Sequence, residues 1–517
     1  MVEEKEVREE EKEVKEDKKE FSSKPDYKII VEYEYKSKEI PILVKIVKKK
    51  GEYVPIYEVS ISSISKSTEF ILEKIRQELI KRVNLGMVEI TDMKKTALVE
   101  EKFEETISDL VNKYFPDLED ETKSFLKSYL IAKSLGLGNI ELLMHDDFLE
   151  EIVVNQSSEP IWVYHKNYGW LKTNIFLKDE DQIKHYARII GRKVGRQITV
   201  LEPLLDAHLS EGDRVNATLQ PISSKGSTLT IRKFSTDPWT ITKFLRTNTI
   251  SVRAAAIIWT AVQYEMSALI AGGTASGKTS MLNVVSNFFP PNQRIISIED
   301  TREMRLPKFL HWVPLNTRQP NPEGKGEISM EDLLVNSLRM RPDRILVGEV
   351  RRKRESETLF EAIHTGHSVY ATFHANNAKE AIERLTNPPI DVPPIMLPAI
   401  SLIIVQFRNR RTGQRRTFQI AEILPDASAN VLMQYDVKTD KISTVNRSKS
   451  FFDNLSLFTG YSQSDIEREL EEKELVLKYL VKQNIESVDG VGRIMAEYYT
   501  EKDNLMKFVK QNKPFEE

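Results

Sequence analysis

The sequence contains no cysteine in 517 residues. Disulfide bonds and thiolate metal sites are therefore excluded, and this absence is typical of a reducing compartment. No window reaches the roughly 18 to 20 apolar residues that a membrane-spanning helix needs. The nearest candidate, residues 395–407, is too short and predicts a buried strand or helix. Residues 1–20 hold 16 charged side chains and no apolar core, which excludes a signal peptide there. We therefore expect a cytoplasmic protein.

The sequence also lacks an excess of either charge. Its 75 Lys and Arg residues nearly balance 78 Asp and Glu residues, which gives a formal net charge of −3. No basic and aromatic patch of the kind found in single-strand binders is present. Neither feature indicates a nucleic-acid partner. A chain of this length is too long for one ordinary core, so two or three domains are expected.

Composition and periodicity divide the chain into four parts. Residues 1–26 are a Glu/Lys-rich run that cannot bury a core, which predicts a disordered tail or, as the alternative, a docking arm for a partner. Residues 27–234 mix alternating and helical patterns and predict an α+β domain, with strands at 218–223 and 228–234. Residues 235–246 predict a linker. Residues 247–517 alternate short apolar runs with helical segments, typical of an α/β domain with a parallel sheet, and end in amphipathic helices.

A complete phosphate-loop pattern, G-x-x-x-x-G-K-S/T, lies in AGGTASGKTS at 271–280. Its glycines allow backbone N–H groups to turn toward phosphate oxygens without a Cβ in the way. Lys278 would place a positive charge on the β and γ phosphates, and Thr279 would ligate Mg²⁺. A helix beginning near Lys278 would add its N-terminal dipole. The residues expected to bind the nucleotide are Gly272, Gly273, Thr274, Ala275, Ser276, Gly277, Lys278, Thr279 and Ser280.

Two further predicted strands end in acidic residues. RIISIED, at 294–300, ends in Glu299 and Asp300, 21 and 22 residues past Lys278. A carboxylate at that strand end would orient or deprotonate an attacking water, although an acidic cap in a surface loop is the alternative. RILVG ends at Gly348, where P-loop enzymes ordinarily have Asp, and Glu349 follows. The longer Glu349 side chain could still reach the shell of the metal ion.

Three of the eight histidines lie within HTGHSVYATFHAN at 364–376. His364 and His367 are three residues apart, but no third ligand follows at metal spacing, which argues against a zinc site. SVYATFH predicts a strand that delivers His374 to the sheet edge where the other strands end. There His374 could sense the γ-phosphate.

These four blocks, GGTASGKT, IEDTREM, ILVGEVR and TGHSVYATFHAN, resemble the type II/type IV secretion ATPase superfamily in their order and intervals. They match its P-loop, aspartate box, atypical Walker B motif and histidine box. ELLMHDDFLEEIVVN, PIWVYHKNYGWLKTN, LLDAHLSEGDRVNATL and TLTIRKF look like the archaeal branch, in particular the motor ATPase of the archaellum. The resemblance covers residues 100–425 and implies a RecA-like P-loop ATPase domain in the C-terminal half.

The resemblance also implies roles for individual residues, with ATP and Mg²⁺ as cofactors. Glu299 is the expected catalytic carboxylate, with Asp300 and Glu303 as neighbours that could share the role. Glu349, with Thr279, would hold the metal or its water. His374, and as a second candidate His367, would couple the phosphate state to domain position. In this family arginines of the N-terminal domain reach the nucleotide, and Arg214 and Arg232 occupy the matching motifs; a guanidinium suits the charge that develops on the γ-phosphate.

The resemblance finally implies a homo-hexameric ring at the inner face of the cell membrane. It would assemble and rotate the archaellum together with a polytopic membrane platform protein, accessory archaellum motor proteins and a contact with membrane lipid. An archaeal adhesive or type IV pilus assembly ATPase shares the same motifs and is the alternative. A DNA translocase and a non-catalytic regulatory subunit are two further readings. The sequence shows no basic and aromatic patch that would favour a DNA translocase. A non-catalytic subunit does not explain why Lys278, Thr279, Glu299 and Glu349 are all intact.

Overall fold

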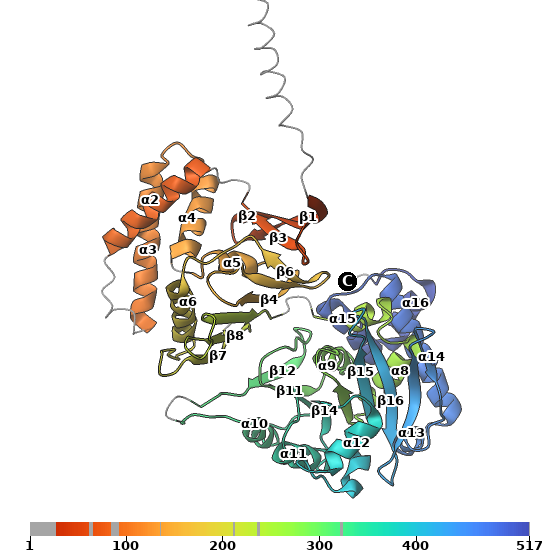
Figure 1. The fold of residues 1–517 in the computed structure, drawn as a ribbon. Coiled ribbons are helices and arrows are strands. Elements are labelled where there is room, and N and C mark those ends of the chain that lie inside the picture. The colour runs from red at the N-terminus through yellow and green to blue at the C-terminus, as the bar shows by residue number, and fades with distance from the viewer. Residues whose placement is uncertain are drawn as a thin grey trace, which may run out of the picture. The chain divides into compact units, whose positions relative to one another are not determined.

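The chain forms two compact units, within residues 1–234 and 235–517, and each is described by itself (Figure 1). The computed structural model describes residues 27–61, 66–83, 93–134, 136–209, 212–234, 238–320 and 324–515. The charged segment 1–26, expected to be a disordered tail, lies outside these described residues. No helix in the described ranges has both the length and the apolar character that a membrane span requires.

The first unit is built on a nine-stranded sheet with the order β1-β2-β3-β6-β5-β4-β9-β8-β7. Neighbouring strands are antiparallel except for the parallel pair β3 and β6. The strands are β1 (Tyr27–Ser37), β2 (Ile40–Lys49), β3 (Ile56–Ser60), β4 (Leu149–Val154), β5 (Trp162–His165), β6 (Gly169–Thr173), β7 (Leu204–His208), β8 (Arg214–Thr218) and β9 (Thr228–Arg232). Alternate residues along β8 and β9 are buried, as expected for a sheet with one face in the core.

Five helices belong to this unit: α2 (Lys66–Val83), α3 (Met93–Tyr114), α4 (Asp120–Ser134), α5 (Asn139–Met144) and α6 (Glu180–Lys193). Helix α6 begins where the Asp179 side chain accepts a hydrogen bond from the backbone N–H of Gln182 at 2.8 Å. Its apolar side chains join those of the sheet in one core. The other face of β8 and β9 carries exposed side chains, including Arg214 and Arg232.

The predicted strand at 218–223 differs from the structure. The strand is β8, Arg214–Thr218, and it forms a hairpin with β7 before the chain leaves the sheet. Pro221 follows three residues later and has no N–H to donate to a neighbouring strand, which disfavours continuation of the ladder.

The second unit also contains a nine-stranded sheet, ordered β12-β11-β13-β14-β10-β15-β16-β17-β18. Strands β12 to β15 in this order are parallel, and the last three are added as antiparallel neighbours. The strands are β10 (Ala268–Gly272), β11 (Arg294–Glu299), β12 (His311–Asn316), β13 (Arg344–Val347), β14 (Ser368–Phe373), β15 (Leu402–Arg408), β16 (Arg415–Ile423), β17 (Ala429–Asp436) and β18 (Lys441–Thr444). Strands β10 and β14 are buried along their whole length.

Helices cover both faces of this sheet, as the two separate apolar clusters on either side of it show. The helices are α7 (Ile241–Arg246), α8 (Val252–Gln263), α9 (Lys278–Ser286), α10 (Met330–Ser337), α11 (Lys353–His364), α12 (Ala378–Thr386), the 3-10 helix η2 (Pro394–Ala399), α13 (Phe451–Thr459), α14 (Gln463–Lys482), α15 (Val488–Thr500) and α16 (Lys502–Gln511). The α/β fold class expected for the C-terminal half, next to an α+β first unit, is therefore confirmed.

Part of the range 235–246, expected to be a linker, belongs to the second unit. Residues Ile241–Arg246 form helix α7, and Ile241, Phe244 and Leu245 are buried in the same cluster as α8. Local polarity around Pro238 suggested a connection, but the apolar side chains that follow it are more stable when they are packed on the core.

Candidate active site

The loop between β10 and α9 has the shape that its glycines allow. Gly277 caps α9 with φ at +97°, a conformation that L-residues with a Cβ rarely adopt. A Cβ on Gly272 would lie 2.8 Å from the backbone oxygen of Gln406, so glycine lets the loop approach β15 closely. The loop therefore turns tightly at the end of a buried strand and leads directly into a helix.

Lys278 is the first residue of α9 and folds back over this loop. Its Nζ donates a hydrogen bond to the backbone oxygen of Gly273 at 3.1 Å, and the Ser276 hydroxyl donates to the same oxygen at 2.9 Å. Burial lowers the pKa of Lys278, and the nearby Glu349 carboxylate opposes that shift. Thr279 and Ser280 follow in the first turn of α9. A cation and the N-terminus of a helix thus meet at one point, which is the arrangement that binds phosphate.

Four parallel strands end at the same edge of the sheet as this loop. The order β11-β13-β14-β10 places the residues that follow each strand next to one another. These residues are Asp300, Gly348 and Glu349, His374, and Gly273. In open parallel sheets, ligands bind outside the carboxyl ends of the strands. The edge therefore carries basic, acidic and imidazole groups together.

Glu299, the last residue of β11, is buried, with 2% of its surface exposed. Its Oε1 accepts hydrogen bonds from the backbone N–H groups of Glu303 at 2.9 Å and Met304 at 3.1 Å. Its Oε2 is also buried and has no hydrogen-bond partner within the described part of the chain. Burial raises the pKa of Glu299 to about 7, and the two backbone hydrogen bonds oppose the rise. A carboxyl group with this pKa can give or take a proton near neutral pH.

Glu349 and Asp300 are joined by Arg351. Nε and Nη2 of Arg351 donate to Oε2 of Glu349 at 3.0 and 2.6 Å, and Nη1 donates to Oδ2 of Asp300 at 2.9 Å. Gly348 stands after β13 where P-loop enzymes ordinarily have Asp, and the acidic residue, Glu349, comes one position later. A Cβ at 348 would lie 3.3 Å from Cα of Glu299, so little room is left for an aspartate there.

His374 follows β14 and lies beside the phosphate loop. Its Nε2 is 3.3 Å from Oγ1 of Thr274. His367, the second candidate in the histidine box, precedes β14 and is therefore at the opposite end of that strand. Its Nδ1 lies near Oγ1 of Thr365 at 3.1 Å and the backbone oxygen of Ala362 at 3.2 Å. Of these two histidines, only His374 is at the sheet edge that carries Lys278.

A cavity of about 240 Å³ adjoins the phosphate loop. Its walls come from three distant segments of the second unit, and they are Trp239, Phe244, Thr247, Thr249, Ser276, Gly277, Ser280, Gln406, Gly413, Gln414, Arg415 and Arg416. Nε of Arg415 donates to the backbone oxygen of Ala275 at 3.1 Å, which fixes one wall to the loop. The aromatic and basic wall residues were not expected from the sequence. No local pattern marks Trp239 or Arg415, because the cavity forms only when the three segments pack together.

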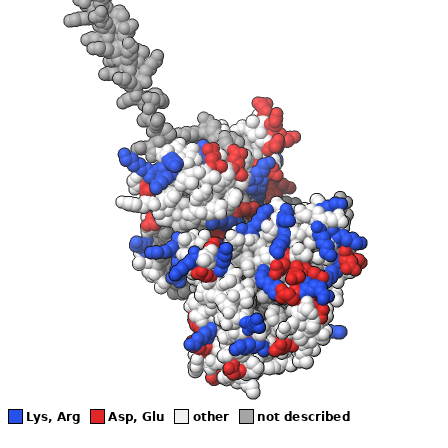
Figure 2. All heavy atoms as spheres, turned by 90° about the vertical axis from the view of Figure 1, so that its right-hand side faces the viewer, with Lys and Arg blue, Asp and Glu red and all other residues white. Residues whose placement is uncertain are grey.

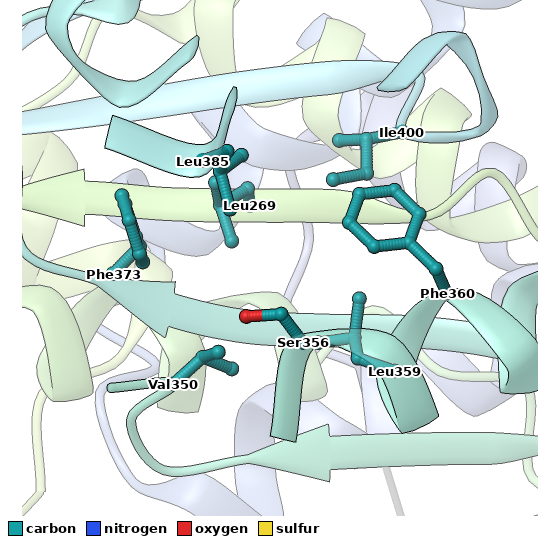
Figure 3. Close-up of a pocket in the computed structure, with 8 residues that line it drawn as sticks. All are labelled: Leu269, Val350, Ser356, Leu359, Phe360, Phe373, Leu385 and Ile400. Carbon is teal, nitrogen blue, oxygen red and sulfur yellow. The ribbon is translucent and has the colours of Figure 1, made fainter. Parts of the chain in front are cut away.

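A second, much smaller cavity lies against the sheet near α11 (Figure 3). Figure 3 shows the side chains of Leu269, Val350, Ser356, Leu359, Phe360, Phe373, Leu385 and Ile400 around it. Its volume is about 10 Å³, and its lining is almost entirely apolar. A space of this size has room for about one water molecule. It is a packing gap in the core and not a place for a nucleotide.

Arg214 and Arg232, the two arginines expected to take part, lie in the first unit. They are direct neighbours across the β8–β9 ladder and are both exposed. Arg214 donates to both carboxylate oxygens of Asp206, at 3.1 and 2.8 Å. Glu151 is the cross-strand neighbour of Arg232 on β4. Like charges directly opposite each other are unfavourable in a sheet, and the carboxylates of Asp206 and Glu151 offset this repulsion.

The chain matches a family model described as type II/IV secretion system protein, over residues 133–416. An uncharacterized protein of Methanocaldococcus jannaschii is 32% identical over 436 residues, which are 82% of this chain and 77% of that protein. The type IV secretion system protein PtlH of Bordetella pertussis is 32% identical over 302 residues, 52% of this chain and 88% of PtlH. Among solved structures, the ATPase DotB of Legionella pneumophila has a TM-score of 0.42 at 19% identity and covers 69% of this chain and 94% of its own.

The family model spans more than half of the sequence. It includes the phosphate loop, both acidic strand ends and His374, as well as β4 to β9 of the first unit. The chain therefore belongs to the type II/IV secretion system protein family.

Proposed function

We propose that the chain is a Mg²⁺-dependent ATPase that works as a hexameric ring to assemble and rotate an archaellum. The observation that carries the ATPase assignment is the convergence of the Lys278 loop with Glu299 and Glu349 at one sheet edge. A phosphate loop alone binds a nucleotide. A buried carboxyl with a pKa near neutrality at the same sheet edge adds a group that can take a proton from water.

The residues present fit a magnesium ion held together with phosphates. In the described ranges, no group of three or more His, Asp or Glu side chains could hold a metal ion by itself. Mg²⁺ in nucleotide sites usually keeps several waters and takes only one or two protein oxygens besides the phosphates. Thr279, on the first turn of α9, and Glu349, after β13, would supply these protein contacts. When bound, the ion neutralises charge on the phosphates.

Each side chain then has a role that its surroundings support. Lys278 would exchange the backbone oxygen of Gly273 for phosphate oxygens. Oε2 of Glu299, buried and unpaired in the described structure, would accept a hydrogen bond from the attacking water and then its proton. His374 Nε2, beside Thr274, would contact the terminal phosphate. The cavity beside Trp239 and Arg415 would take the nucleoside end of ATP.

Arg214 and Arg232 would complete the nucleotide site of a second unit, either in the same chain or in a neighbouring chain of the ring. Their exposed, adjacent guanidinium groups suit the charge that develops on the γ-phosphate. Nucleotide binding would then draw a first and a second unit together, and hydrolysis with release would let them separate. A closed ring of such subunits would apply these movements to one central partner.

The proposed partners are a polytopic membrane platform protein, accessory archaellum motor proteins and membrane lipid, at the inner face of the cell membrane. An archaeal adhesive or type IV pilus is the second candidate machine, because the same site would serve it. Deleting the encoding gene and scoring swimming separately from pilus formation tests the choice. Loss of swimming is expected, and loss of pili with intact swimming would contradict the archaellum assignment.

A DNA translocase is a weaker reading. Figure 2 shows basic and acidic side chains adjoining one another on the face in view, and the chain carries a net charge of −3. Backbone binding to DNA needs a field of positive charge. Stimulation of ATP hydrolysis by DNA, but not by anionic lipid vesicles, would favour the translocase instead.

The ATPase assignment itself is tested by phosphate release from ATP with the purified full chain. Hydrolysis should require Mg²⁺ and should be lost in Glu299→Gln, which keeps the hydrogen-bond acceptor for the loop but cannot take a proton. Full turnover in this variant would mean that Glu299 is not the base. Size-exclusion chromatography with added nucleotide and Mg²⁺ measures the oligomeric state. A chain that stays monomeric under all conditions would contradict the hexamer.

A further inference from the structure

Arg351 forms an ion pair with Glu349, the carboxylate that the proposed function assigns to the metal ion. Two of its nitrogens bind one oxygen of Glu349, at 3.0 and 2.6 Å, and the third binds Asp300 at 2.9 Å. All three nitrogens of the guanidinium are thus engaged with acidic residues. A charge-assisted contact of this kind is among the stronger hydrogen bonds in proteins. Glu349 therefore has a cation in place before any metal arrives.

The position of Arg351 also brings it close to a second cation. Arg351 and Lys278 are close enough for their positive charges to repel each other, and both interact electrostatically with Glu349. Only 24% of the Glu349 side chain is exposed, whereas 60% of Arg351 is exposed. The carboxylate is therefore held in the site, and the guanidinium is the partner that has room to move. Polyanionic phosphates beside Lys278 would relieve the repulsion between the two cations and would offer Arg351 a second anionic partner once Mg²⁺ takes Glu349.

We propose that Arg351 is a built-in counter-ion of Glu349 that competes with Mg²⁺ and is displaced toward the phosphates when Mg²⁺ and nucleotide bind together. The inference rests on the proposed Mg²⁺–nucleotide site and adds a residue that sets how much Mg²⁺ the site requires. Arg351 would act on the metal ion through the Glu349 carboxylate. A nucleotide without the metal would leave the Arg351–Glu349 pair intact.

This role predicts that the Mg²⁺ requirement falls when Arg351 is removed, whereas a supporting role predicts that it rises. If Arg351 competes with the metal, its removal strengthens Mg²⁺ binding. If Arg351 merely holds Glu349 in the correct place, its removal weakens Mg²⁺ binding. The pair is partly exposed, and exposed ion pairs are worth up to about 1 kcal/mol. We therefore expect a change of about five-fold in the Mg²⁺ requirement.

The experiment measures binding of a fluorescent ADP analogue to the full chain while Mg²⁺ is titrated. Arg351→Met should lower the Mg²⁺ concentration at half-saturation about five-fold, and Arg351→Lys should lie between it and the wild type. Lys353→Met is the matched control, because Lys353 is two residues away and its Nζ pairs with Asp391 at 3.0 Å. It removes the same charge without touching Glu349, so it should leave the Mg²⁺ requirement unchanged. Adding Glu349→Gln should abolish the effect of Arg351→Met, because the carboxylate over which the two cations compete is then gone.

The same titration distinguishes failure of the Arg351 role from failure of the Mg²⁺ site. An unchanged or increased Mg²⁺ requirement in Arg351→Met, with Mg²⁺-dependent binding in the wild type, overturns the inference and leaves the ATPase proposal standing. An equal decrease in Lys353→Met also overturns it, because net charge then explains the effect. If the wild type binds the analogue with no dependence on Mg²⁺, the Mg²⁺ site fails and the inference fails with it.

Discussion

Substituting Glu299 by glutamine should change how the stability of the protein depends on pH. The carboxyl group is buried at 2% exposure, and its pKa is raised from 4.5 to about 7 by burial. Between these two values the folded chain holds a proton that the unfolded chain has lost. The free energy of unfolding therefore falls as the pH rises through this window, by about 3 kcal/mol at about 1.4 kcal/mol for each pKa unit. The stabilising effect is complete below pH 4.5 and is lost above pH 7.

Glutamine removes the titrating group but still accepts from the N–H groups of Glu303 and Met304. Urea unfolding, followed by tryptophan fluorescence at several pH values, measures the difference between wild type and Glu299→Gln. As the pH rises from 5 to 8, the free energy of unfolding of the variant should increase by about 3 kcal/mol relative to that of the wild type. This relative change does not depend on the absolute stability of the variant. Glu361→Gln, on the exposed side of α11, makes the same chemical change without burial and serves as the control. Parallel pH profiles for wild type and Glu299→Gln would refute the assignment of a raised pKa to this carboxyl.

Four further results are expected. Lys278→Ala should reduce phosphate release by at least about 100-fold, because the cation at the phosphates is lost, while the circular dichroism spectrum should stay unchanged. Trp239→Ala should weaken binding of labelled ADP about ten-fold by removing an aromatic wall of the 240 Å³ cavity; unchanged affinity would mean that the nucleoside lies elsewhere. Arg214→Ala and Arg232→Ala should each lower kcat by about 100-fold or more with little change in ADP binding, because they would act on charge that develops during cleavage. Gly348→Asp should lower the free energy of unfolding by about 1 to 3 kcal/mol, since its Cβ would lie 3.3 Å from Cα of Glu299, and unaltered urea unfolding would show that the strand end has more room.

The phosphate loop is encoded by a short local pattern of residues. Its function depends on consecutive residues whose backbone must turn tightly, so the pattern of Gly272, Gly277 and Lys278 was sufficient to locate it. The acidic strand ends could also be located, because an apolar run followed by a carboxylate is a local signal. The sequence did not predict that Glu299 faces inward onto the backbone of 303–304. Burial of one carboxylate depends on what packs against it.

The histidine box shows the same division. The strand-like run SVYATFH predicted that His374 lies at the sheet edge where the other strands end, and His367 remained a second candidate. Only the insertion of β14 between β10 and β13 places His374 at the phosphate loop and leaves His367 at the far end. Strand order is set by long-range packing and not by the residues of the strand itself.

By itself, the sequence determined the α/β class of the C-terminal half, the phosphate loop and the residue types at the strand ends. Each of these depends on neighbours within a few positions along the chain. The tertiary structure decided the rest: the cavity lined by Trp239 and Arg415, the close approach of Gly348 to Glu299, and the Arg351 bridge to Asp300 across 51 positions. These features depend on distances between segments that become neighbours only when the apolar faces of strands and helices are buried together. No pattern local to any one of those segments carries that information.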